Sequence, residues 1–109
     1  MDITFEDPKL RKVAEDEKAL VRKFGLSTAR KLQLRLTDLR SATAVADLRE
    51  LPGRWHPLAA DLNECWAADV GHPCRIVVKP TPPVPRLPDG GVDWQEVTRV
   101  TVIGLWDYH

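Results

Sequence analysis

The apolar residues of this 109-residue chain change their spacing at one point, the turn Leu51-Pro52-Gly53. Before this turn they recur every three to four positions, which is the period of an amphipathic helix. After it they alternate with polar residues, which is the period of a strand. Helices followed by strands are typical of α+β folds and not of parallel sheets built from alternating strands and helices. The sequence therefore predicts N-terminal helices packed on a C-terminal antiparallel β-sheet, within one domain that spans residues 1–109.

The N-terminal half predicts a short strand or ordered arm at residues 1–6, followed by helices. Asp7 and Pro8 are favourable at the start of a helix, and Gly25 is favourable at its end, so one helix is expected over 8–24. Ser27 is the expected N-cap of a second helix that ends near residues 41–43. A third, short helix is expected over 44–50.

Strands are expected in the C-terminal half at four places: 54–58, 64–70, 74–79 and 97–106. Residues 71–73 read as the tip of a hairpin. Five of the nine prolines fall between Lys79 and Trp94, so residues 80–93 are expected to be a Pro-rich loop rather than the interior of a strand.

The last strand is apolar on both faces, which predicts a central strand that ends in a polar group, Asp107-Tyr108-His109. Strict alternation places the following residues on one face: Arg99, Thr101, Ile103, Leu105, Asp107 and His109. It places another set on the opposite face: Val100, Val102, Gly104, Trp106 and Tyr108. A frayed, polar chain end is the alternative interpretation.

Composition excludes some classes of function. Sixteen basic and sixteen acidic side chains give a formal net charge of zero, so nucleic-acid binding would require a local basic patch. No segment approaches the roughly 18 apolar residues of a membrane span, and we expect a cytoplasmic protein with no membrane partner. Cys65 and Cys74 lack the spacing of a disulfide scaffold or a zinc knuckle and are expected to be small core residues.

Four motifs occur in a fixed order along the chain: Leu51-Pro52-Gly53-Arg54-Trp55-His56-Pro57-Leu58, Cys65-Trp66, Cys74-Arg75-Ile76 and Trp106-Asp107-Tyr108-His109. In this order and at these separations they resemble the HigB-type (plasmid maintenance "killer") toxins of the RelE/ParE superfamily. The resemblance spans most of the chain. It implies a toxin of a type II toxin-antitoxin system that cuts mRNA on the ribosome, without a metal or other cofactor, until an antitoxin neutralises it.

The same resemblance implies that the active-site positions are His56, Arg75, Asp107, Tyr108 and His109. The residue types suit RNA cleavage, which needs a base, an acid and fixed positive charge beside the phosphate. The two histidines are candidate base and acid, and Arg75 is a candidate phosphate ligand. Asp107 would orient a histidine, and Tyr108 would donate a proton or stack on a base. Arg54 and Lys79 are expected to bind RNA phosphates.

Two other hypotheses remain open. The chain reads Ala59-Ala60-Asp61 where the family often has a Lys after its HPL motif, which leaves room for a non-catalytic or ParE-like protein that binds a protein target. A metal site is the other hypothesis, although its candidate ligands have poor spacing for zinc: His56, Cys65, His72, Cys74 and His109.

The expected partner, implied by the resemblance, is a HigA-like helix-turn-helix antitoxin that forms a hetero-oligomer with the chain. The charges of the helical half are compatible with such a partner. Acidic residues 15–17 and basic Arg30, Lys31 and Arg35 occupy separate stretches, a mixed-charge surface suited to steering a protein. Ordinary solvation of a helix face is the alternative.

Overall fold

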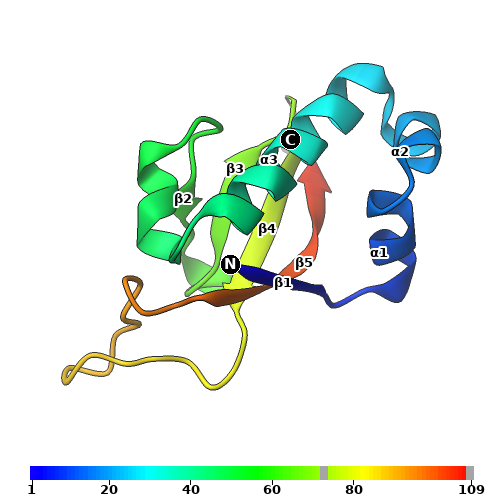
Figure 1. Cartoon of the computed structure of the whole chain (residues 1–109). Coiled ribbons are helices and arrows are strands. Elements are labelled where there is room, and N and C mark those ends of the chain that lie inside the picture. Colours follow the sequence, from blue (N-terminus) through cyan, green and yellow to red (C-terminus); the bar gives the residue numbers. More distant parts are fainter. Residues whose placement is uncertain (72–73, 108–109) are drawn as a thin grey trace.

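A computed structural model describes residues 1–71 and 74–107, the last two by their backbone alone (Figure 1). His72, Tyr108 and His109 therefore lie outside the described residues. The elements in chain order are β1 (Asp2–Phe5), α1 (Pro8–Ala14), α2 (Glu17–Phe24), α3 (Leu26–Ser41), the 3-10 helix η1 (Val45–Glu50), β2 (His56–Pro57), the 3-10 helix η2 (Ala60–Leu62), β3 (Trp66–Asp69), β4 (Cys74–Pro80) and β5 (Arg99–Asp107). The predicted α+β class is confirmed.

The five strands form one mixed sheet in the order β1-β5-β4-β3-β2. Neighbours from β2 to β5 are antiparallel, which confirms the prediction for the C-terminal strands, and the N-terminal strand β1 adds a parallel neighbour beside β5. The parallel pairing is possible because most of the chain, including all the helices, separates the two strands. The predicted central position of the last strand is confirmed, since β5 lies between β1 and β4.

The single helix expected over residues 8–24 is wrong, because the chain breaks between α1 and α2. Asp16 causes the break: its carboxylate accepts a hydrogen bond from the Ala19 amide at 3.2 Å and caps α2. An Asp side chain competes in this way with the helical backbone. Ser27 is not an N-cap either, since α3 begins at Leu26 and Gly25, at φ 85°, occupies the junction. The predicted cap at Asp7 is confirmed.

The strands at residues 54–58 and 64–70 are shorter than expected. Arg54 and Glu64 have φ values of 60° and 67°, in the left-handed region that strands do not use, so β2 and β3 begin only after them. Among the described residues, no helix is both long enough and apolar enough to cross a membrane.

The sheet has one face covered by helices, and the opposite face, called the open face below, carries a smaller apolar cluster. On the covered face α3 packs against the sheet through a large apolar cluster that includes Leu36, Leu39, Trp66, Ile76, Val78, Val100 and Val102. Figure 1 shows α3 crossing this face. A small cluster on the opposite face contains Cys65, Ala67 and Val77, with Leu58, Leu62 and Ile103 packed against it.

A β-bulge shifts the alternation of β5. Val77 pairs with Gly104 but Val78 pairs with Val102, so Ile103 is an extra residue in β5. Ile103 packs in the small cluster of the open face, whereas Leu105 packs in the large cluster under the helices. The expected grouping of Ile103 with Leu105 on one face is therefore wrong.

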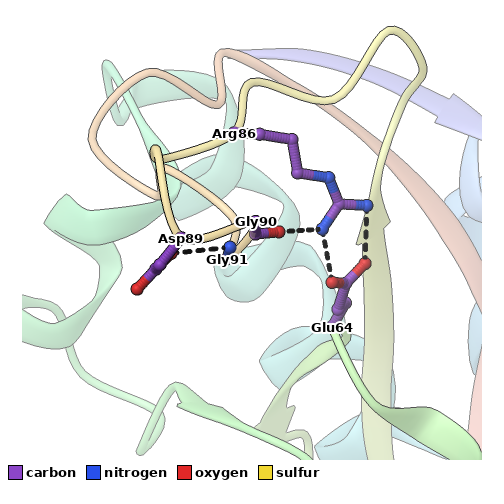
Figure 2. Close-up of polar contacts among 5 residues, drawn as sticks. All are labelled: Glu64, Arg86, Asp89, Gly90 and Gly91. Carbon is purple, nitrogen blue, oxygen red and sulfur yellow. Dashed lines mark hydrogen bonds and ion pairs between the residues drawn. The ribbon is translucent and has the colours of Figure 1, made fainter.

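The segment between β4 and β5 contains the Pro-rich residues and extends away from the sheet, as Figure 1 shows. It is anchored by Arg86, which forms two hydrogen bonds to the Glu64 carboxylate, at 2.5 and 3.0 Å (Figure 2). Arg86 also donates to the Gly90 carbonyl, and the Asp89 carboxylate accepts from the Gly91 amide at 2.8 Å. The hydrogen bonds from Arg86 lower the pKa of Glu64, and those to Glu64 raise the pKa of Arg86.

Candidate active site

Strand register places several predicted site residues on the open face of the sheet. His56 pairs with Ala67, which pairs with Val77, and Asp69 pairs with Arg75. Cross-strand partners share a face, so His56, Asp69 and Arg75 lie on the same side as the small apolar cluster. His56 and Arg75 are two strands apart and two residues apart along the strands, which corresponds to about 12 Å between Cα atoms.

His56 lies on the outermost strand, β2, directly after a tight turn. Gly53 and Arg54 both have positive φ, at 104° and 60°, and this turn directs the chain back into the sheet. The His56 ring nitrogen Nδ1 lies 2.6 Å from the Arg54 carbonyl oxygen. Because a carbonyl only accepts, Nδ1 carries the hydrogen, and Nε2 of the neutral ring has an unshared electron pair. The half-buried imidazole is therefore oriented as a proton acceptor through Nε2.

Arg75 is half-buried near the start of β4, a strand paired on both sides. Its register partners are Asp69 on β3 and Trp106 on β5. A guanidinium fixed on a central strand can present parallel N–H donors to a phosphate with little reorganisation.

Asp69 was not among the predicted site residues. It ends β3 on the open face, and its carboxylate lies 3.7 Å from Nε of Arg54. Its backbone amide donates to the Gly53 carbonyl at 2.8 Å, which fastens the His56 turn to β3. Strict alternation of side chains from Cys65 through Ala67 to Asp69 would have predicted Asp69 on the open face. The carboxylate adds a negative charge beside two arginines.

The two predicted phosphate ligands have different positions. Arg54 lies beside His56 with a side chain that is 86% exposed. Lys79 is on the same face as Arg75 but four residues along β4, a separation of about 13 Å. Its ammonium group forms an ion pair with Glu6 at 2.9 Å. The structure brings Arg54 to the site and leaves Lys79 at the other end of the strand.

The C-terminal candidates can be placed only in part. Asp107 ends β5 and pairs through its backbone with Cys74, one residue before Arg75, so the chain end reaches the same end of the sheet as Arg75. Tyr108 and His109 lie outside the described residues. Their roles stay predictions.

The residues proposed for a metal site do not converge where they are described. Cys65 and Cys74 belong to different apolar clusters, on opposite faces of the sheet. Burial raises the pKa of the Cys65 thiol, which disfavours the thiolate that binds metals. Within residues 1–71 and 74–107, no group of three His, Cys, Asp or Glu side chains is arranged to hold a metal ion. His72 and His109 lie outside this part of the chain.

Comparison with solved structures identifies the fold. The chain aligns over its whole length with the YoeB-YefM complex from Staphylococcus aureus, with a TM-score of 0.59, 15% identity and 97% of that chain covered. It aligns equally completely with the YoeB/ParE toxin from Agrobacterium tumefaciens, with a TM-score of 0.55, 13% identity and all of that chain covered. A YoeB dimer from Staphylococcus aureus gives a TM-score of 0.56 at 16% identity. No family model and no curated protein matches the sequence.

Proposed function

We propose that this chain is a HigB-like toxin of a type II toxin-antitoxin pair, acting in the cytoplasm as a metal-independent endoribonuclease on ribosome-bound mRNA. The observation that carries the proposal is the open end of the sheet, where His56 presents Nε2 on the same face as Arg75. The fold supports it, because solved structures that share the fold over the whole chain are described as toxins or as toxin-antitoxin complexes.

The proposed reaction is an attack of a ribose 2'-hydroxyl on the adjacent phosphate. His56 Nε2 takes the hydroxyl proton, the new O–P bond forms, and the bond from phosphorus to the 5'-oxygen breaks. The products are a 2',3'-cyclic phosphate and a 5'-hydroxyl, whose proton is donated by an acid, expected to be His109 or Tyr108. Arg75 stabilises the negative charge that develops on the phosphoryl oxygens.

Expression of the chain alone in bacteria tests the proposal. We expect growth arrest with rapid loss of mRNA, and relief of both effects by Arg75→Ala. Arg22→Ala, at an exposed position on α2, is the matched control and is expected to remain toxic. Growth arrest without mRNA loss would favour the second candidate function instead.

The second candidate is a ParE-like protein that binds a protein target without cutting RNA. Residues 59–61 favour it: Ala59, Ala60 and Asp61 lie after the HPL segment, and the exposed Asp61 places a negative charge where the family often has a lysine. Capture of a cellular protein by the chain together with intact mRNA is the expected result for this function.

The proposed neutralising partner is a HigA-like antitoxin that forms a hetero-oligomer with the chain. Arg30 and Lys31 are exposed on α3, as the expected mixed-charge surface requires. Arg35 is not part of that surface, because it is buried beneath the turn at Gly53. Charge reversal at Arg30 and Lys31 is therefore expected to weaken the complex, and an unchanged complex would place the interface elsewhere.

A further inference from the structure

A cationic cleft lies on the helix side of the sheet end that carries the candidate active site. It is bounded by α3 and by the turns at residues 53–54 and 69–71, and has a volume of about 400 Å³. The residues that line it are Lys31, Leu34, Arg35, Gly53, Arg54, Asp69 and Gly71. Three of these carry positive charge and one carries negative charge.

Arg35 is the buried group of this cleft, with only 10% of its side chain exposed. It forms an ion pair with Asp38, one turn further along α3, at 3.5 Å. The guanidinium nitrogens Nε and Nη1, and the Asp38 Oδ2 atom that Nη1 faces, are buried and form no hydrogen bond within the described residues. A guanidinium carries five N–H donors, and burying them without acceptors is unfavourable. An oxyanion in the cleft would supply an acceptor to the part of the guanidinium that lines it.

The turn at Gly53 is built around this arginine. A Cβ atom on Gly53 would lie 2.0 Å from Nη1 of Arg35, so a glycine is required for the backbone to approach the guanidinium. Gly71 similarly packs its backbone against Thr28 and Lys31 of α3. Both glycines also have positive φ, at 104° and 105°. The cleft is therefore shaped by two turns that lie close against α3.

Two residues connect the cleft to the candidate active site. Arg54 lines the cleft, and its carbonyl oxygen accepts the hydrogen bond that orients His56. Asp69 also lines the cleft, and it is the register partner of Arg75. A strand bound across His56 and Arg75 can thus extend around the end of the sheet to Lys31 and Arg35.

We propose that this cleft is a phosphate site that holds a backbone phosphate of the RNA, next to the phosphate that is cleaved. The proposal rests on the proposed function. Arg35 places its guanidinium at the base of the cleft, while Lys31 and Arg54 lie at its mouth. The connection to His56 and Arg75 through Arg54 and Asp69 favours an RNA phosphate over a carboxylate of an acidic protein partner.

The first experiment uses the full chain and inorganic phosphate, titrated against chloride at constant ionic strength. We expect a saturable shift of the Arg35 Nε–H signal and of the Gly53 amide in nuclear magnetic resonance spectra. Lys31→Gln is expected to weaken phosphate binding. Arg30→Gln, an exposed neighbour that does not line the cleft, is the matched control and is expected to leave binding unchanged. Equal shifts with chloride, or no saturation, would overturn the phosphate site.

The second experiment measures RNA. Lys31→Gln and Arg35→Met are expected to raise KM several-fold with kcat unchanged, since a flanking phosphate contributes equally to binding of substrate and transition state. Binding is measured with an RNA whose 2'-hydroxyls are methylated, so that it cannot be cleaved. In a plot of log Kd against log salt concentration, each variant should lower the slope by about 0.7. A merely structural role of Arg35 would lower the melting temperature without changing this slope.

The outcomes separate the two proposals. Undiminished RNA binding and cleavage by both variants would overturn the phosphate site and leave the proposed function standing. Phosphate binding by a chain that cuts no RNA under any condition would contradict the proposed function, and with it the RNA as occupant. Variants that weaken antitoxin binding but not RNA binding would assign the cleft to a protein carboxylate and overturn the proposal.

Discussion

The hydrogen bond from His56 Nδ1 to the Arg54 carbonyl gives this imidazole one orientation and one tautomer. A base held in this way needs no rearrangement before it accepts a proton, and such a group contributes about 10²- to 10⁴-fold to a rate. We expect His56→Ala to lower single-turnover RNA cleavage by this range while the melting temperature stays within a few degrees. Cleavage by His56→Ala at the parent rate would show that another group is the base.

Cys65 illustrates a residue whose burial sets its chemistry. Its pKa is raised above the ordinary value, mainly by burial. A raised pKa in the folded state means that folding favours the neutral thiol. The stabilisation of the folded state by the neutral thiol is therefore present below the unfolded pKa of Cys65 and is lost as the pH rises through its folded pKa. In a Cys74→Ser background, we expect Cys65 to react with a disulfide reagent at pH 8 more slowly than in the denatured chain. Equal rates in the two states would contradict the burial.

At the junction of α1 and α2, one side chain determines where the second helix begins. The Asp16 carboxylate caps α2 through the Ala19 amide, and loss of such a cap typically costs about 1 kcal/mol. We expect Asp16→Ala to lower the free energy of unfolding by about this amount in urea titrations. Glu15→Ala is the matched control, because Glu15 is exposed and caps through its backbone alone. Equal effects of the two substitutions would contradict the capping role.

The Pro-rich segment depends on the pair between Arg86 and Glu64 (Figure 2). The pKa of Glu64 is lowered, so the pair is intact above the unfolded value of 4.5 and is lost as the pH falls through the lower, folded value. We expect the heteronuclear NOE of Gly90 and Gly91 to fall in Glu64→Gln at neutral pH, and in the parent chain only as the pH falls through the lowered pKa of Glu64. Glu50→Gln should leave both signals unchanged. Rigid glycines in Glu64→Gln would show that the segment is fixed by other contacts.

The sequence predicts elements well where local chemistry acts alone and less well where distant residues compete. The cap at Asp7, the short helix near residues 44–50 and the central last strand follow from their own residues. The helical period predicts Asp16 as a charged residue inside one helix, because the period does not reveal a competing hydrogen bond. The bulge at Ile103 is also invisible to strict alternation, since it depends on how β4 and β5 pair.

The candidate site was predictable to a similar extent. His56 and Arg75 share a face as the motifs imply, and the missed Asp69 joins them through pairing between strands. Arg35 was expected to be exposed, because a basic residue beside an apolar stripe usually faces water. The turn at Gly53 covers it, and that contact joins residues that are far apart in the sequence.

At the scale of the whole molecule, zero net charge coexists with a locally basic end of the sheet. Lys31, Arg35, Arg54 and Arg75 lie at this end together with two carboxylates, those of Asp38 and Asp69, whereas Lys79 is paired with Glu6 at the other end. Since RNA binding depends on local phosphate contacts and their counterions, a neutral chain can bind RNA through such a patch. The helices cover one face of the sheet, and the half-buried His56 and Arg75 lie on the opposite face.

The most direct test of the central claim is single-turnover cleavage of mRNA by the purified chain with ribosomes, in the presence of a chelator that removes divalent ions not held by the ribosome. We expect products with 2',3'-cyclic phosphate and 5'-hydroxyl ends, and a rate at least about 10²-fold lower for Arg75→Ala, since a fixed cation beside the reacting phosphate is lost. Arg22→Ala, at an exposed helix position, should cut like the parent. Intact mRNA with the parent chain, or equal cleavage by Arg75→Ala, would contradict the account.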